Sequence, residues 1–146
     1  MTYKPKTVAE WFLHRAAADD KTLTQMKLQK LVYMAHGWKL GLFGQPLINE
    51  FVEAWQWGPV IRDLYADYVQ YGASPIDVAS APPRLDEQSG KLLEKVWDTY
   101  GRYTAAQLSD LTHRKGTPWS LTYQPKNKLV IPNALIKSHY EQLAAK

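Results

Sequence analysis

The sequence contains no cysteine among its 146 residues. That absence excludes a disulfide framework, a thiolate nucleophile and a cysteine-ligated metal site, and it suits a reducing compartment. Long hydrophobic runs are also missing, because the longest one near the middle, residues 31–35, ends at His36. A membrane-spanning helix needs roughly 18 apolar residues, and a secretion signal needs an apolar segment that the N-terminus does not show. We therefore expect a cytoplasmic protein without a membrane-embedded part.

Positive charge is not concentrated in one segment of the chain. The net charge is +4, but residues 1–30 carry a net +3, residues 31–80 a net −3 and residues 81–146 a net +4. Proteins that read nucleic acid usually cluster Lys and Arg on one face or along one helix. Nucleic acid is thus not the expected partner, although folding could still gather the two basic ends into one patch.

The motifs of common enzyme classes are missing as well. There is no Gly-rich phosphate loop, no H-E-x-x-H and no G-x-S-x-G, and the four histidines lack metal-ligand spacing. Asp110 and His113 lie three residues apart on an expected helix and could form an orienting pair for a general base. A simple hydrogen bond explains them with fewer assumptions. The expectation is a protein that is not an enzyme and holds no cofactor and no metal.

Hydrophobic spacing and end signals predict a mainly α, compact multi-helix single domain covering residues 1–146, with at most a small β element. The strongest helix follows a Thr24 N-cap. Its apolar residues recur at helical spacing, which is typical of a buried stripe, and they are Leu28, Leu31, Val32, Ala35 and Leu42. A capping box at Thr7 to Glu10 is expected to start the first helix, and Gly41 and Gly44 are expected to end the second.

Signals for the starts and ends of helices and strands are equally clear in the second half of the chain. Residues 49–56 have the composition of a short strand or an extended loop, and residues 129–131 could form a strand. Gly58-Pro59 is expected to begin a helix with Pro59 in its first turn. Later helices are expected to follow caps at Asp86, Thr104 and Thr117. A last helix is expected at about 132–145.

Aromatic residues with a polar atom are unusually frequent. The chain has six Trp and nine Tyr against three Phe. Trp and Tyr are enriched in protein interfaces, where the apolar part of the ring is buried and its N–H or O–H group forms a hydrogen bond. The hypothesis is that Trp55, Trp57, Tyr65 and Tyr68 contact a partner protein. Packing in the core is the alternative role for the same rings.

Three blocks of sequence resemble one known family. They are residues 27–38 (KLQKLVYMAHGW), residues 53–65 (EAWQWGPVIRDLY), and residues 108–113 (LSDLTH) followed by 117–119 (TPW). Their order and spacing resemble the Panacea domain of phage-associated, SocA-like antitoxins, over about residues 24–119. The residues that carry the resemblance are Lys27, Leu28, Lys30, Leu31, Tyr33, Trp38, Glu53, Gly58, Pro59, Val60, Leu108, Thr112, His113, Pro118 and Trp119.

The resemblance implies an antitoxin that neutralises a cognate protein toxin by direct binding, with the toxin encoded by an adjacent gene. Two alternatives remain open: an adaptor that delivers the toxin to the ClpXP protease, and a regulator that binds nucleic acid. The resemblance supplies no catalytic residue. For the motif residues themselves we expect structural roles, including an ion pair between Glu53 and Lys27 or Lys30.

Overall fold

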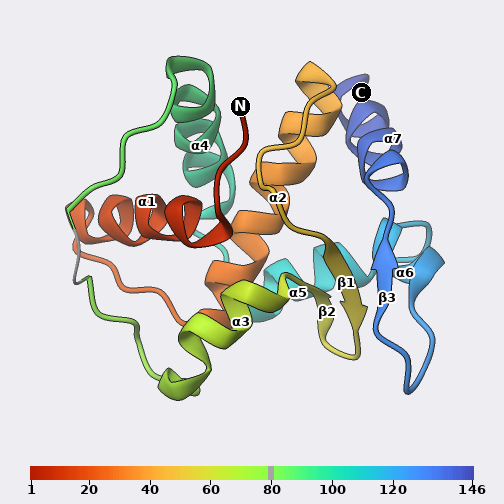
Figure 1. Cartoon of the computed structure of the whole chain (residues 1–146), viewed down its shortest axis with the longest axis horizontal. Coiled ribbons are helices and arrows are strands. Elements are labelled where there is room, and N and C mark those ends of the chain that lie inside the picture. Colours follow the sequence, from red (N-terminus) through yellow and green to blue (C-terminus); the bar gives the residue numbers. More distant parts are fainter. Residues whose placement is uncertain (79–80) are drawn as a thin grey trace.

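The computed structural model describes residues 1–78 and 81–146 (Figure 1). Within these residues it contains seven α-helices, one 3₁₀ helix and a three-stranded sheet, which confirms the predicted fold class. In chain order the elements are α1 (Pro5–Ala18), α2 (Gln25–Phe43), β1 (Val52–Trp55), β2 (Gly58–Val60), α3 (Arg62–Tyr68), η1 (Val69–Tyr71), α4 (Glu87–Tyr100), α5 (Ala105–His113), α6 (Pro118–Thr122), β3 (Leu129–Ile131) and α7 (Asn133–Ala144).

Helix α2 is the centre of the molecule. It runs between α1 and α4 on one side and α7 and the sheet on the other (Figure 1). The Thr24 side chain accepts a hydrogen bond from the Lys27 backbone N–H, as predicted, and Gly44 ends the helix with a φ of 69°. The helix therefore continues past Gly41, and the prediction that Gly41 ends the helix is wrong.

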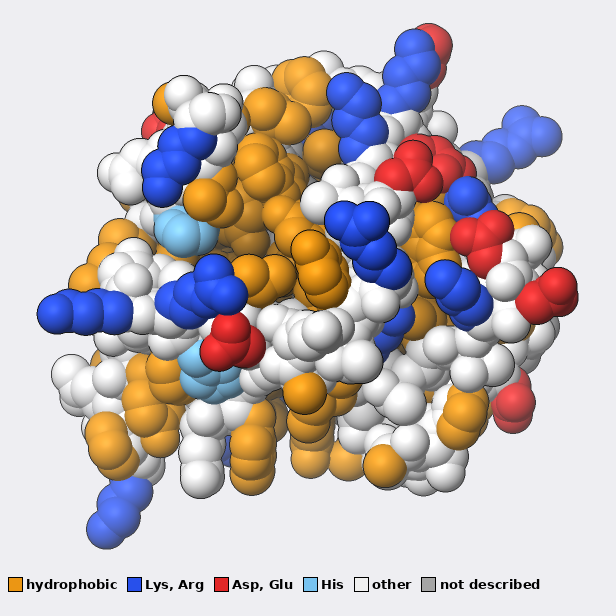
Figure 2. All heavy atoms as spheres, turned by 180° about the vertical axis from the view of Figure 1, so that it is seen from behind, with side chains coloured by type: hydrophobic (Ala, Val, Ile, Leu, Met, Phe, Trp, Pro, Cys, Tyr) orange, Lys and Arg blue, Asp and Glu red, His pale blue; other side chains and the backbone are white. Residues whose placement is uncertain are grey.

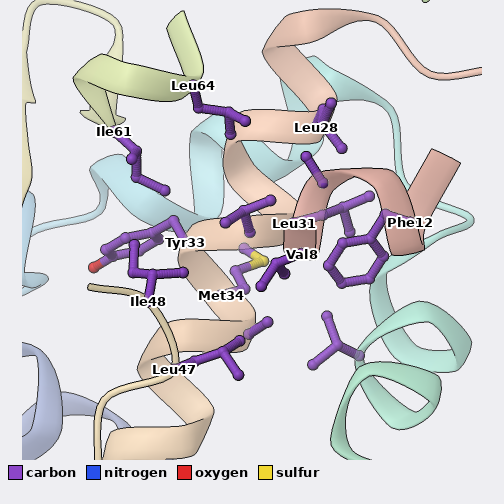
Figure 3. Close-up of a cluster of buried hydrophobic side chains, with 14 of the residues drawn as sticks. Val8, Phe12, Leu28, Leu31, Tyr33, Met34, Leu47, Ile48, Ile61 and Leu64 are labelled. Atoms are coloured by element: carbon purple, nitrogen blue, oxygen red, sulfur yellow. The ribbon is translucent and has the colours of Figure 1, made fainter. Parts of the chain in front are cut away.

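The core forms where α2 meets its neighbours. Figure 3 shows Leu28, Leu31 and Met34 of α2 close to Val8 and Phe12 of α1, with side chains of α3 and the 47–48 segment completing the cluster. Four members of the predicted stripe are fully buried, as their helical spacing predicts: Leu28, Leu31, Val32 and Ala35. Leu42 was expected in the same stripe, but it is 49% exposed. It lies in the last turn of α2, where the helix faces an open hollow beside α4 and not the core.

The sheet corrects another expectation. Its order is β2-β1-β3, both pairs are antiparallel, and Trp55 pairs with Gly58 across the hairpin. The Gly58-Pro59 pair lies in strand β2, and the next helix begins only at Arg62. Gly58 has a φ of 117°, outside the helical range, and a following proline favours extended backbone in the residue before it. Pro59 also suits an edge strand, because it has no N–H to leave unpaired.

Most of the predicted caps are confirmed. Asp86 accepts from the Ser89 N–H, Thr104 forms a capping box with Gln107, and Thr117 accepts from the Ser120 N–H. The box expected at Thr7 is wrong, because α1 begins two residues earlier at Pro5. The proline ring presets the helical φ, and so the first turn forms there without a side-chain cap.

Helices α2 and α7 approach closely because α2 carries two glycines. A Cβ added at Gly37 would overlap the Tyr140 ring, and one added at Gly41 would lie 2.7 Å from the Tyr140 Cβ. Tyr140 is in turn packed edge to face against Trp38, with ring centroids 5.1 Å apart. The missing side chains thus set the distance between the two helices.

We predict that Gly37→Ala destabilises the protein by about 1–3 kcal/mol through overpacking. Gly90→Ala in α4 is the matched control. A Cβ there meets nothing within 4 Å, and so better helix propensity should stabilise the fold by about 0.5–1 kcal/mol. Urea denaturation measures both changes. Stabilisation by both substitutions would contradict the proposed α2–α7 contact.

A buried histidine ties α2 to two other segments. His36 is fully buried, its Nδ1 accepts from the Leu47 N–H at 3.2 Å, and its Nε2 lies 3.0 Å from Asn133 Oδ1. Burial lowers its pKa below the ordinary 6.5. Protonation at Nδ1 would also replace an accepted hydrogen bond with donor–donor repulsion.

We predict that the contribution of His36 to stability is full above about pH 6.5 and falls as the pH drops toward the lower folded-state pKa of His36. The sign follows because, in that window, the unfolded chain binds a proton that the folded chain does not. Burial also lowers the pKa of His139. Urea denaturation between pH 5 and 8 should therefore show that the free energy of unfolding falls less steeply with decreasing pH in His36→Asn than in the unsubstituted protein. His139→Asn should change that slope by less than His36→Asn does. An unchanged slope in His36→Asn would contradict this assignment.

Candidate functional site

The turn between β1 and β2 is held by residues from distant parts of the chain. Gly58 faces Lys30 of α2 and His113 of α5, and a Cβ at position 58 would lie 3.1 Å from Lys30 Cε and from His113 Cε1. Glycine is therefore needed both for its positive φ and for the close approach of two side chains. Each of the three blocks identified in the sequence contributes one of these three residues.

Trp119 of α6 fixes the same hairpin from another direction. Its indole N–H donates to the Trp55 backbone oxygen at 2.6 Å, and its ring lies 4.1 Å from the His113 ring, centroid to centroid. The Ser109 hydroxyl donates to the Trp57 backbone oxygen at 3.4 Å. The hairpin is thus bonded at the last residue of β1, Trp55, and within the turn, at Trp57.

Asp110 and His113 do not form the alternative orienting pair, and simple hydrogen bonds account for both residues, as expected. The Asp110 carboxylate bonds to Arg114 at 3.1 Å, and His113 Nδ1 donates to the Ser109 backbone oxygen at 2.6 Å. An i, i+4 ion pair and a bond to the helix backbone satisfy the two groups separately. No oriented general base results from this arrangement.

The expected ion pair between Glu53 and Lys27 or Lys30 is wrong. Glu53 accepts from Arg62 at 2.9 Å and from the Trp55 indole at 2.8 Å, while Lys27 donates to the Gly101 backbone oxygen. Alternation along β1 explains the difference: Val52 and Ala54 face the core, and so the Glu53 side chain faces away from it. Burial lowers the pKa of Lys30, which is 2% exposed, to about 8.

The other motif residues have structural positions. The Trp38 indole donates to the Tyr100 hydroxyl at 3.0 Å, and the Thr112 hydroxyl donates to the Ser109 backbone oxygen at 2.9 Å. Burial raises the pKa of Tyr33 well above its ordinary value. The remaining buried members of the set are Leu28, Leu31, Pro59, Val60, Leu108 and Pro118.

The four aromatic residues predicted to bind a partner divide into two groups. Trp57 is 59% exposed and Tyr65 is 37% exposed, whereas Trp55 and Tyr68 are each only 7% exposed. Tyr68 packs in the core beside Tyr71, away from the hairpin. Trp55 lies beneath Tyr65, with ring centroids 5.1 Å apart. The surface available to a partner is therefore that of Trp57 and Tyr65, and burial leaves Trp55 and Tyr68 little area to offer.

A shallow hollow of about 440 Å³ lies beside the hairpin turn. Its lining combines the hairpin and Tyr65 with the loop that precedes β3, which contributes Tyr123, Lys126 and Lys128. The Lys128 ammonium lies 4.2 Å from the Trp55 ring centroid, a cation–π contact. We call Trp57, Tyr65, Tyr123, Lys126 and Lys128 the hairpin surface. It is aromatic and basic, and no acidic side chain lines the hollow.

Sequence reasoning missed the contribution of the 123–128 loop. The loop lies about sixty residues after the hairpin, and only the pairing of β3 with β1 brings the two together. The signal was present in part, because short strands were among the structures expected for residues 49–56 and 129–131. Pairing them would have placed Lys126 and Lys128 beside Trp55.

Two further features are absent from the described parts of the chain. Among residues 1–78 and 81–146 no group of three His, Asp or Glu side chains could hold a metal ion. No helix in those ranges is long and apolar enough to cross a membrane.

Comparison with known proteins identifies a family. The family model described as Antitoxin SocA-like, Panacea domain, matches residues 28–120. Those residues include Lys30, Gly58, His113 and Trp119, which form the support of the hairpin. The protein named Antitoxin SocA from Caulobacter vibrioides (strain NA1000 / CB15N) is 36% identical over 129 residues, covering 80% of this chain and 68% of that relative. No solved structure matches the chain. The chain belongs to the family of SocA-like antitoxins that share the Panacea domain.

Proposed function

We propose that this antitoxin neutralises its toxin by direct binding and that the hairpin surface makes the contact. One observation carries the proposal: the Trp57 side chain is 59% exposed. It lies at a turn that Lys30, His113 and Trp119 support from beneath. A large exposed indole on a supported backbone loses little conformational entropy when a partner covers it. Residues of this kind supply most of the binding free energy in protein interfaces.

The charge of the hairpin surface indicates what the toxin presents to it. Lys126 and Lys128 line the hollow, and Arg62 lies beside it in an ion pair with Glu53. Exposed lysines around an aromatic centre favour a partner with acidic side chains at the rim of its own interface. The toxin gene is proposed to lie next to that of the antitoxin.

Two related roles are distinguished by experiment. An adaptor for the ClpXP protease would make the toxin disappear from the cell, whereas an antitoxin that masks the toxin leaves it intact in a complex.

The combination of Trp57, Tyr123 and Lys126 also resembles surfaces that stack single-stranded nucleic acid. That role requires binding to an oligonucleotide that weakens steeply with salt.

The first prediction concerns growth. Co-expression of this chain with the product of the neighbouring toxin gene should restore the growth that the toxin alone abolishes. Immunoblots of both proteins show whether the toxin persists in the rescued cells. Full toxicity despite soluble expression of both proteins would contradict the proposal.

The second prediction concerns the aromatic residues. Trp57→Ala and Tyr65→Ala should each weaken toxin binding by about 2–4 kcal/mol in calorimetry, because each removes an exposed ring from the interface. Melting of the free protein should change little. Trp55→Ala should instead lower the melting temperature, because its ring is buried beneath the surface.

Phe51→Ala is the matched control for these substitutions. Phe51 is 72% exposed, but it precedes β1 at the end of the strand remote from the turn. Its loss should leave both affinity and melting unchanged. Unchanged affinity in a stably folded Trp57→Ala variant would place the interface elsewhere on the molecule.

A further inference from the structure

A second surface lies on the opposite side of α5 and α6 from the hairpin. Two hollows of about 300 Å³ and 180 Å³ adjoin at Tyr100, which lines both. The first lies among α2, α5 and α7, and the second lies between α2 and α4. Together they form what we call the helix groove. Figure 2 shows hydrophobic side chains gathered in a hollow on this side of the molecule, with Lys and Arg side chains and some Asp and Glu side chains around it.

The floor of the helix groove is apolar and aromatic. Leu111, Tyr140 and Leu143 line one hollow, and Trp38, Leu42 and Val96 line the other. Leu42 is 49% exposed although it is a large apolar residue on the central helix. From Met34 to Leu42 the groove follows α2 for about 12 Å, the rise of about two turns of helix. A segment with apolar side chains at i, i+4 and i+7 matches that length and shape.

The charged residues of the groove all have one sign. Lys95 lines one hollow and Arg114 and Lys115 line the other, and neither hollow is lined by an acidic side chain. Arg114 is paired with Asp110. In the described ranges, neither Lys95 nor Lys115 forms an ion pair. Two unpaired ammonium groups beside an apolar floor complement an amphipathic helix that carries Asp or Glu beside its apolar stripe.

The groove and the hairpin surface share their supporting elements. Thr112 and Pro118 line the groove, while the neighbouring His113 and Trp119 hold the hairpin. Both surfaces are basic, and so one acidic partner can cover both across the ridge of α5 and α6. We infer that the helix groove binds an amphipathic, acidic α-helix of the toxin. The inference rests on the proposed function, because it assigns a second contact to the same partner.

The absence of cysteine allows a direct test. A single Leu42→Cys substitution in the full chain gives one attachment point for a photo-crosslinker in the groove. Gln56→Cys, at the exposed turn of β1 and β2, gives one at the hairpin surface. Lys6→Cys in α1, exposed and outside both surfaces, is the control. Each labelled protein is irradiated with the toxin that passes the co-expression test, and the linked peptide is identified by mass spectrometry.

The inference requires that Leu42→Cys links to a helical toxin segment containing Asp or Glu, and that Lys6→Cys does not link to the toxin. Linkage from Gln56→Cys without linkage from Leu42→Cys would overturn the groove assignment and leave the proposed function standing. Linkage from neither site would overturn both. Linkage of Leu42→Cys to a second copy of this chain, or to the toxin as efficiently as Lys6→Cys, would also overturn the inference.

Charge reversal tests the complementarity on which the inference depends. The double substitution Lys95→Glu and Lys115→Glu should weaken toxin binding about tenfold at low salt, and the difference should shrink as salt screens the rim. The double substitution Lys6→Glu and Lys21→Glu is the charge-matched control, because both lysines are exposed and neither lines the groove or the hairpin hollow. Equal affinities for the groove variant and the control would overturn the assignment of an acidic helix to this groove.

Discussion

Gly58 has a φ of 117°, and the space where its side chain would begin is bounded by Lys30 and His113. This contact joins α2, the β1–β2 hairpin and α5, and Trp119 adds α6 through its bond to the Trp55 backbone. A side chain at position 58 would have to displace a buried lysine and a histidine already bonded to its own helix. The close approach at Gly58 therefore fixes the β1–β2 turn, while the pairing of β3 with β1 adds the 123–128 loop beside it.

Local signals predicted the helices well, because each depends on a few neighbouring residues. Thr24, Asp86, Thr104 and Thr117 cap their helices as their sequence context indicates. Gly58-Pro59 misled the same reasoning, because a proline suited to a helix start also suits an edge strand. Only pairing with β1 decides between the two. Leu42 shows the same limit of local signals. Helical spacing predicts which face of α2 its side chain lies on, but the width of the groove beside it depends on how α4 packs.

The candidate site was harder to predict than the fold. The sequence placed Trp55, Trp57, Tyr65 and Tyr68 in one aromatic group, whereas strand alternation and helix packing divide them into buried and exposed members. The two lysines of the hairpin surface, Lys126 and Lys128, lie in a loop that the pairing of β3 with β1 brings to the hairpin. Glu53 was matched to the wrong cation for a similar reason, since Arg62 approaches it only after the chain turns from β2 into α3. Side-chain types were readable from the sequence, but their neighbours across the fold were not.

Amide hydrogen exchange of the antitoxin, free and bound to its toxin, tests the central claim most directly. Exchange depends on local opening and on coverage, and so it reports which backbone segments a partner protects. If the hairpin surface is the interface, the toxin should slow exchange at the β1–β2 turn around Gln56 and Trp57 and in the loop at 123–128. Strong protection elsewhere, with these two segments exchanging as in the free protein, would contradict the account.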